Sequence, residues 1–121
     1  MLESIDRQRA MNLLEATVEG RKGFHYDTRD GCKYVQDGQP SCLIAHVLSN
    51  AGVSTKLLAR LDDLPFASIG YYGVTDILAE EVDITAVAVV ILKAAQDQQD
   101  QGHSWESALA HAYDLYLRIG E

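Results

Sequence analysis

Residues 84–119 decide the fold, and they read ITAVAVVILKAAQDQQDQGHSWESALAHAYDLYLRI. The opening ITAVAVVIL could by itself be a buried strand, but the apolar spacing continues through LKAAQDQQDQ and favours a helix over residues 84–101. Gly102 ends this helix, and Ser104 is placed to cap another. Two amphipathic helices joined by so short a break form an antiparallel helical hairpin. The apolar positions of the second helix are Trp105, Ala108, Leu109, Ala112, Tyr116 and Ile119.

Four shorter helical segments are expected upstream of this hairpin, because apolar residues recur there at helical spacing behind capping residues. Their expected positions are residues 5–19 after Ser4, residues 42–51 after Ser41, the stretch between Ser54 and Pro65, and a short turn over residues 76–81, with residues 66–73 irregular. The predicted fold class is therefore mainly α, a compact bundle of about five helices.

The segment between the first two of these helices, residues 21–39, is rich in turn signals. Asp30-Gly31 and Asp37-Gly38 are strong turn dipeptides, because glycine tolerates positive φ and aspartate bonds its own backbone. Residues 24–26 and 33–35 could pair with each other as two strands. An isolated hairpin is only marginally stable in water, so this one would have to pack against the helices. We therefore expect a short β-hairpin or turn-rich segment between the first and second helices.

Length and composition favour one globular domain over residues 1–121. A chain of 121 residues can bury about two thirds of its unfolded surface, and 47% hydrophobic with 23% charged residues is ordinary for a folded protein. The first residues mix acids and bases without an apolar core, unlike a secretory signal. The longest apolar run, residues 86–92, is far shorter than the ~20 residues of a membrane span. These features predict a cytoplasmic protein with its two cysteines reduced and no membrane partner.

The net charge of −8 is unevenly placed along the chain. Residues 1–60 carry seven acids and eight bases, whereas residues 61–121 carry eleven acids and two bases. Binding to a nucleic-acid backbone needs clustered lysine and arginine, so this acidic half disfavours nucleic acid as a partner. It suits solubility or a basic protein partner.

Four residues around the turn-rich segment supply the ligand types that zinc prefers: Cys32, Cys42, His46 and His25. Their spacing argues against a zinc site, because such sites typically use close ligand pairs and nine residues separate the two cysteines. No cofactor is therefore expected, and these residues are weak candidates for metal ligands.

Cys42 is also the best candidate for a nucleophile. A cysteine in the first turn of a helix has its thiolate favoured by the helix dipole, and His46 at i+4 lies on the same side as a candidate base. The sequence places no group to orient that histidine and holds no complete catalytic signature elsewhere. A protein that is not an enzyme is therefore the favoured hypothesis, and a small thiol-dependent enzyme or redox protein is the alternative.

Residues 43–61 (LIAHVLSNAGVSTKLLARL) have the outline of a helix-turn-helix, with Gly52 in the turn. The second helix would read DNA, but it offers only Lys56 and Arg60 and is followed by two aspartates. Packing of two helices across a glycine turn explains the same pattern. A DNA-associated regulator is therefore a further alternative, which the net charge disfavours.

Two motifs resemble those of a group of small uncharacterised proteins from actinobacteriophages and their actinobacterial hosts. One is Cys-x-Tyr followed by Gly-x-Pro-x-Cys, an apolar helix and a Leu-Gly-Val-like turn; the other is Gly-x-x-Trp-x-x-Ala-Leu. The matching positions are Cys32, Tyr34, Gly38, Pro40, Cys42, Gly52, Val53, Gly102, Trp105, Ala108 and Leu109, with Ala51 in place of the usual leucine. The resemblance covers roughly two thirds of the chain. It implies a phage-encoded factor in the cytoplasm of the bacterial host cell, and it implies no activity.

The candidate partner-binding residues are Tyr71, Tyr72, Glu80, Glu81 and Asp83. Aromatic residues beside acids are common at the centres and edges of protein interfaces. We therefore expect a non-enzymatic accessory protein that binds a host or phage protein through an acidic, aromatic-bearing surface.

The helical hairpin also predicts self-association. Val89 falls on the opposite side of its helix from Ile84 and Ile91, so one face of a small monomer cannot bury every apolar residue. An exposed apolar strip of this kind commonly packs against an identical chain about a two-fold axis. The pattern therefore predicts a homodimer.

Overall fold

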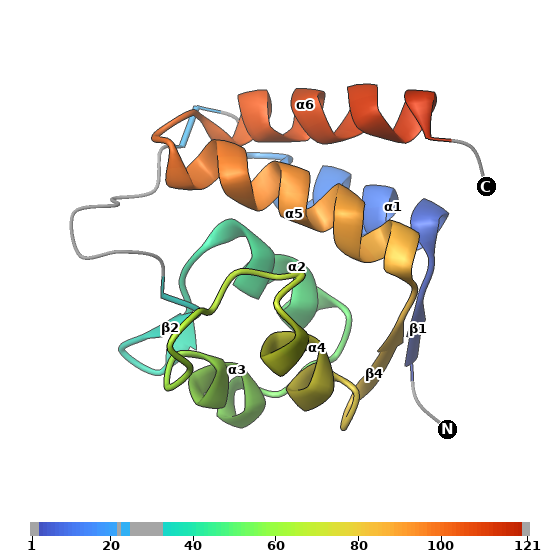
Figure 1. Cartoon of the computed structure of the whole chain (residues 1–121). Helices are drawn as coiled ribbons and strands as arrows, with labels where there is room; N and C mark the ends of the chain where they lie inside the picture. Colours follow the sequence, from blue (N-terminus) through green and yellow to red (C-terminus); the bar gives the residue numbers. More distant parts are fainter. Residues whose placement is uncertain (1–2, 22, 25–32, 120–121) are drawn as a thin grey trace.

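The computed structural model describes residues 3–21, 23–24 and 33–119, and within these ranges it contains six helices and two pairs of short strands (Figure 1). In chain order the elements are β1 (Glu3–Ile5), α1 (Arg7–Val18), β2 (Val35–Gln36), β3 (Gln39–Pro40), α2 (Leu43–Asn50), α3 (Thr55–Leu61), α4 (Tyr72–Leu78), β4 (Val82–Ile84), α5 (Ala86–Asp100) and α6 (Trp105–Arg118). The mainly α fold class predicted from the sequence is confirmed. None of the helices in these ranges has both the length and the apolar character that crossing a bilayer requires.

α5 and α6 form the predicted helical hairpin, and α1 packs against both of them (Figure 1). Ser104 caps α6 as expected, because its Oγ accepts the N–H of Ser107 at 3.1 Å. Trp105, Ala108 and Ala112 are buried inside this chain, whereas Leu109, Tyr116 and Ile119 on the same face are partly exposed. The buried apolar residues of these helices and of α2, α3 and α4 belong to one cluster.

Part of the apolar arc of α5 remains outside this core. Ile91 is fully buried, whereas Val89 is half-buried and the side chain of Val90 is 47% exposed. The helix therefore carries apolar surface beyond what the monomer covers, and the homodimer stays a prediction.

The first residues form a strand instead of the start of a helix. β1 pairs in parallel with β4, so that Ser4 lies opposite Asp83 and Ile5 opposite Ile84. Ile5 is fully buried, and the pairing satisfies backbone groups that a helix would satisfy internally. The helix starts expected at residues 5 and 84, and the expected Ser4 cap, are therefore wrong. Strand pairing between two segments far apart in the sequence overrides the local helical spacing.

Each of these strands runs directly into a capped helix. Asp6 Oδ1 accepts the N–H of Arg9 at 2.8 Å, and Thr85 Oγ1 accepts the N–H of Ala88 at 3.1 Å. A side-chain oxygen at this position satisfies one of the N–H groups that the first helical turn leaves unpaired. Asp6 and Thr85 are therefore the N-caps of α1 and α5.

A short β-hairpin lies between α1 and α2, as predicted. β2 and β3 pair across Asp37 and Gly38, which both have positive φ (54° and 76°), the conformation that a two-residue hairpin turn requires. β2 pairs with β3, which follows the Asp37-Gly38 turn, whereas the sequence suggested that residues 33–35 would pair with residues 24–26. Phe24 instead accepts the backbone N–H of Trp105 at 2.8 Å, while residues 25 and 26 and the Asp30-Gly31 turn lie outside the described residues.

α2 begins one residue later than expected, and its first turn is capped from another element. Cys42 is the N-cap residue without a side-chain cap bond, so the expected Ser41 cap is wrong. The N–H of Leu43 is instead donated to Gln99 Oε1 on α5 at 2.7 Å. Gln99 is fully buried, and the bond pairs a backbone donor that water cannot reach.

α3 is capped by Ser54 as expected, since Ser54 Oγ accepts the N–H of Leu57 at 3.2 Å. The helix ends at Leu61, before Pro65 could stop it. α4 begins at Tyr72, inside the stretch expected to be irregular, and ends at Leu78, so the helix expected over residues 76–81 was placed too late.

Candidate interaction surface

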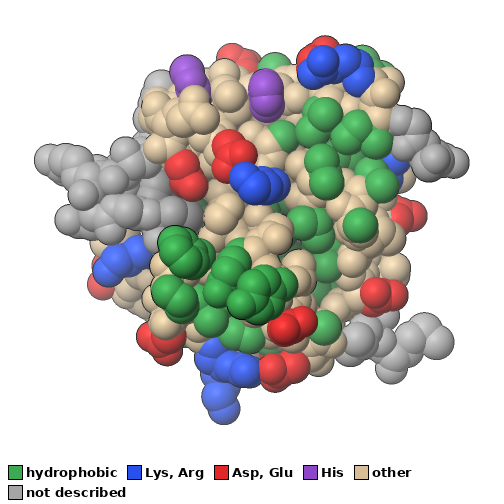
Figure 2. Space-filling model, viewed as in Figure 1, with side chains coloured by type: hydrophobic (Ala, Val, Ile, Leu, Met, Phe, Trp, Pro, Cys, Tyr) green, Lys and Arg blue, Asp and Glu red, His purple; other side chains and the backbone are tan. Residues whose placement is uncertain are grey.

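Three aromatic side chains, Phe66, Tyr71 and Tyr72, form a contiguous cluster that we call the aromatic surface. The ring centroids of Phe66 and Tyr71 are 5.6 Å apart, and those of Tyr71 and Tyr72 are 4.7 Å apart. Phe66 is 66% exposed and Tyr72 is 71% exposed. Figure 2 shows hydrophobic side chains gathered where Figure 1 places α4 and the loop before it. The structure thus adds Phe66 to the two tyrosines that the sequence singled out.

A buried glutamine holds the loop that carries this surface. Gln96 Oε1 on α5 accepts the N–H of Ile69 at 2.7 Å, and its Nε2 donates to the hydroxyl of Tyr34 at 3.1 Å. The Tyr34 hydroxyl in turn donates to the carbonyl of Ala67. Gln96, Tyr34 and Ile69 are all fully buried. The loop between Phe66 and Tyr71 is therefore fixed to α5 by hydrogen bonds that do not compete with water.

Two glycines allow the aromatic side chains to lie where they do. Gly70 has a φ of +101°, and a Cβ added there would come within 3.2 Å of the Lys93 side chain on α5. A Cβ on Gly73 would come within 2.8 Å of the Tyr71 ring, so the ring would have to shift to admit any side chain there. Gly70 thus permits the close approach of the loop to α5, and Gly73 leaves room for the Tyr71 ring.

Tyr72 also affects the ionisation of Tyr71. A hydrogen bond with Tyr72, followed by desolvation, raises the pKa of Tyr71 above its ordinary value of 10.0. Tyr71 therefore remains a neutral phenol at physiological pH, able to exchange hydrogen bonds with a partner.

The three candidate acids lie beyond the other end of α4, and two of them already have partners. Both carboxylate oxygens of Glu80 accept from Arg60 at 2.8 Å, a bond that lowers the pKa of Glu80 and raises that of Arg60. One carboxylate oxygen of Glu81 accepts a hydrogen bond from the backbone N–H of Ser54 at 2.7 Å, and the other accepts one from the Ser54 hydroxyl at 2.8 Å. Asp83 is exposed on β4.

The structure does not place these acids beside the aromatic rings. Glu80 follows Tyr72 by eight residues, along α4 and the turn after it. At a rise of 1.5 Å per residue, the two positions are about 12 Å apart along the helix axis. The contacts of Glu80 and Glu81 join α3 to the end of α4, so their first role is to position these helices.

Cys42 and His46 occupy a packed site at the start of α2. Cys42 is fully buried, and the His46 ring packs edge-on against Trp105 with centroids 5.6 Å apart. Burial, and secondarily the charge of Arg21, lowers the pKa of His46 below 6.5. Within the described residues no carboxylate binds the His46 ring, so the third member of a catalytic triad is not found there.

The candidate metal ligands are only partly placed. Cys42 and His46 are described, whereas His25 and Cys32 lie outside the described residues. Among residues 3–21, 23–24 and 33–119, no group of three or more histidine, cysteine, aspartate or glutamate side chains could hold a metal ion.

α2 and α3 form the helical corner expected of a helix-turn-helix, with Gly52 at a φ of +97° in the turn. Of the two cations on the second helix, Arg60 binds Glu80 and Lys56 is exposed, while Asp62, just after the helix, accepts the backbone N–H of Tyr34 at 2.8 Å. Packing therefore accounts for this corner without DNA.

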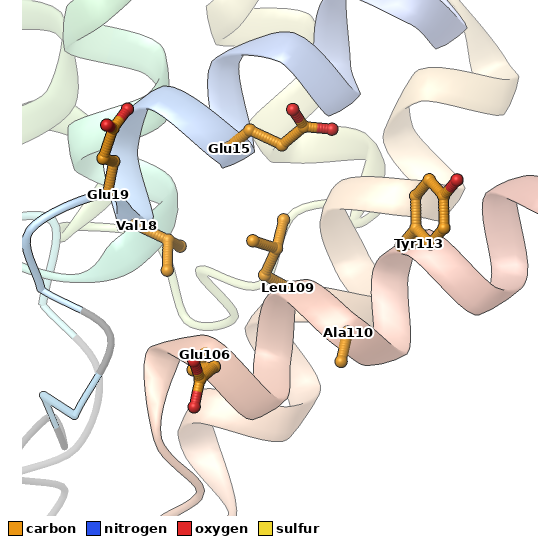
Figure 3. A pocket seen from close by; sticks show the side chains of 7 residues that line it. All are labelled: Glu15, Val18, Glu19, Glu106, Leu109, Ala110 and Tyr113. Carbon is orange, nitrogen blue, oxygen red and sulfur yellow. The ribbon is translucent and has the colours of Figure 1, made fainter.

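A groove of about 500 Å³ lies between α1 and α6 (Figure 3). No local pattern in the sequence indicates this groove, because its walls come from opposite ends of the chain. It is lined by Glu15 and Val18 of α1, by the C-cap residue Glu19, and by Glu106, Leu109, Ala110 and Tyr113 of α6.

Comparisons of the chain with protein-family models, with curated protein sequences and with solved structures gave no match.

Proposed function

We propose that this protein is not an enzyme and acts by binding another protein through the aromatic surface. The observation that carries the proposal is the joint exposure of Phe66 and Tyr72, at 66% and 71%, at the two ends of a loop fixed by buried hydrogen bonds. A large aromatic side chain covers about 150–250 Å² when buried, so these rings offer considerable apolar area to a partner.

The rigidity of this surface supports the proposal. Binding by a mobile loop costs entropy, because each side chain must be ordered on association. Here Ile69 is fully buried and bonded to Gln96, so the backbone that carries the neighbouring rings is held before any partner arrives. Tyrosine is enriched among the residues that dominate protein interfaces, for it offers apolar area and a hydroxyl on a stiff side chain.

The resemblance to actinobacteriophage proteins suggests the class of partner, a protein of the phage or of its host. The eleven acids and two bases of residues 61–121 favour a basic protein surface. Asp83 is exposed and available for such a contact, whereas Glu80 binds Arg60 and Glu81 binds Ser54, so these two acids would contribute mainly through their negative charge.

The alternative thiol chemistry receives less support from the arrangement of the site. A nucleophilic thiolate needs access to substrate and a group that stabilises its charge. Cys42 is fully buried and His46 packs on Trp105.

The proposal is tested by capture from an actinobacterial lysate at physiological salt, with the protein and its Phe66→Ser/Tyr72→Ser variant as baits. Leu117→Ser is the matched control, because Leu117 is 61% exposed on α6 and lies outside the aromatic surface. We expect one protein to be recovered by the wild type and by the control and to be lost with the double variant. Equal recovery by all three baits, or no specific recovery by the wild type, would contradict the proposal.

A further inference from the structure

We propose that the α1–α6 groove is a second binding site, which takes a basic amphipathic helix of a partner protein. The groove combines an apolar floor with exposed carboxylates, and it shares no residue with the aromatic surface. A helix laid into a groove between two helices is a common way of recognising a peptide.

The floor of the groove is apolar. Figure 3 shows Val18 and Leu109 directed toward each other between the two helices. Ala110 and Tyr113 extend this surface along α6, and Tyr113 is 47% exposed. The lining of α6 runs from Glu106 to Tyr113, about 10 Å or two helical turns. Two apolar side chains at i and i+7 on a docked helix, about 10 Å apart along its axis, would match this length.

The charge around the floor is of one sign. Glu15 on α1, Glu19 at its C-cap and Glu106 on α6 are exposed, and in the part of the chain that the structure describes no lysine, arginine or histidine lines the groove. None of these three carboxylates has an ion-pair partner among the described residues. Glu15 and Glu19 are also four residues apart on one helix, a spacing at which like charges disfavour the helix. Lysine or arginine beside the apolar anchors of a docked helix would complement all three.

The probe for this site is a synthetic helical peptide of about 14 residues, or four turns, with leucines along one face and lysines beside them. Its matched control carries glutamates in place of the lysines. Titration by calorimetry should give saturable one-to-one binding of the basic peptide and none of the acidic one. Chemical-shift changes in the labelled protein should centre on Val18, Leu109 and Tyr113. Shift changes confined to other regions would overturn the proposal.

Variants separate a specific groove from general attraction to an acidic protein. The variant Glu15→Gln/Glu19→Gln/Glu106→Gln should bind the basic peptide roughly eightfold more weakly, because each of the three exposed charge pairs contributes about a factor of two. The control removes the same charge outside the groove through Asp63→Asn, Asp76→Asn and Asp83→Asn, and it should bind within about twofold of the wild type. An equal loss in both variants would overturn the proposal.

The variant Ala110→Glu distinguishes docking in the groove from attraction by net charge, because the two explanations predict opposite changes in peptide affinity. This substitution adds an acid, so attraction by net charge alone would strengthen binding of the basic peptide. It also places a longer polar side chain on the apolar floor, so docking in the groove would be weakened, and we expect weaker binding. Ala110 is exposed on a helix and glutamate is a good helix former, so the fold should be retained, as circular dichroism would verify. Stronger binding by this variant would refute the site. The Phe66→Ser/Tyr72→Ser variant should bind the peptide normally, which keeps this test separate from that of the aromatic surface.

Discussion

Replacing Gln96 with leucine should detach the loop that carries the aromatic surface. The change keeps a side chain of similar size and removes the amide that joins Ile69 to Tyr34. The N–H of Ile69 would then lie buried without its acceptor, and the Tyr34 hydroxyl would lose the donor from Gln96.

The magnitude follows from these two losses. A buried donor left unsatisfied costs about 1–3 kcal/mol, and the lost bond to the Tyr34 hydroxyl costs about 0.5–1.5 kcal/mol. Gln96→Leu should therefore lower the free energy of unfolding by about 2–4 kcal/mol. For a chain of this length, that corresponds to a fall in Tm of roughly 8–15 °C.

The assay is urea unfolding followed by circular dichroism, together with hydrogen exchange of the Ile69 amide. Gln98→Leu is the matched control, because it makes the same substitution two residues along α5 at a partly exposed side chain, and it should change stability by less than about 0.5 kcal/mol. Tyr34→Phe removes the same bond from the other side, so the double variant should lose less stability than the sum of the two single variants. A Gln96→Leu variant as stable as Gln98→Leu, or strict additivity with Tyr34→Phe, would refute this reasoning.

Four further predictions follow from single features. Gly70→Ala should cost about 1–2 kcal/mol in urea unfolding, because φ is +101° there and an alanine Cβ would crowd α5; an unchanged midpoint would contradict this. The folded-state pKa of His46 lies below 6.5, so the unfolded chain takes up the proton first and stability falls as pH drops below 6.5. Between about pH 7.5 and about pH 5.5, the free energy of unfolding should fall less for His46→Gln than for the wild type. An equal fall in both proteins would contradict the lowered pKa of His46. Cys42→Ser should lose about 1–2 kcal/mol on melting and still bind its partner, whereas lost binding without lost stability would show that the thiol acts directly. Light scattering at tens of micromolar should give twice the chain mass of 13.3 kDa, and a species of 13.3 kDa would exclude the homodimer.

The sequence predicted the elements whose signals are local. The Ser54 and Ser104 caps and the Asp37-Gly38 turn each depend on a few neighbouring residues, and all three are present. The α5–α6 hairpin is present for the same reason, since helical spacing is regular over both of its helices.

The errors arose where the deciding contact is distant in sequence. Ile84 fits the apolar spacing of a helix, but it pairs with Ile5 in a strand that no local pattern indicates. Ser41 is a reasonable cap by residue type, yet the N–H of Leu43 is bonded by Gln99 from α5. Tertiary contacts of this kind override local propensity.

The candidate surface was only partly predictable. The two adjacent tyrosines were identified by their residue type, but Phe66 joins them only because Gln96 folds the intervening loop against α5. The groove between α1 and α6 could not be found at all, since its acids and its apolar floor belong to two helices that meet only in the folded chain.

Hydrogen exchange of the protein with and without its captured partner, at physiological salt, tests the central claim most directly. The account predicts slower exchange in the partner complex over residues 66–78, which include the aromatic surface and α4. The same complex should leave α2 and α3 unchanged, because their apolar residues are already buried within the chain. Protection confined to other elements, with residues 66–78 exchanging as in the isolated protein, would contradict the claim that this surface is where the protein binds.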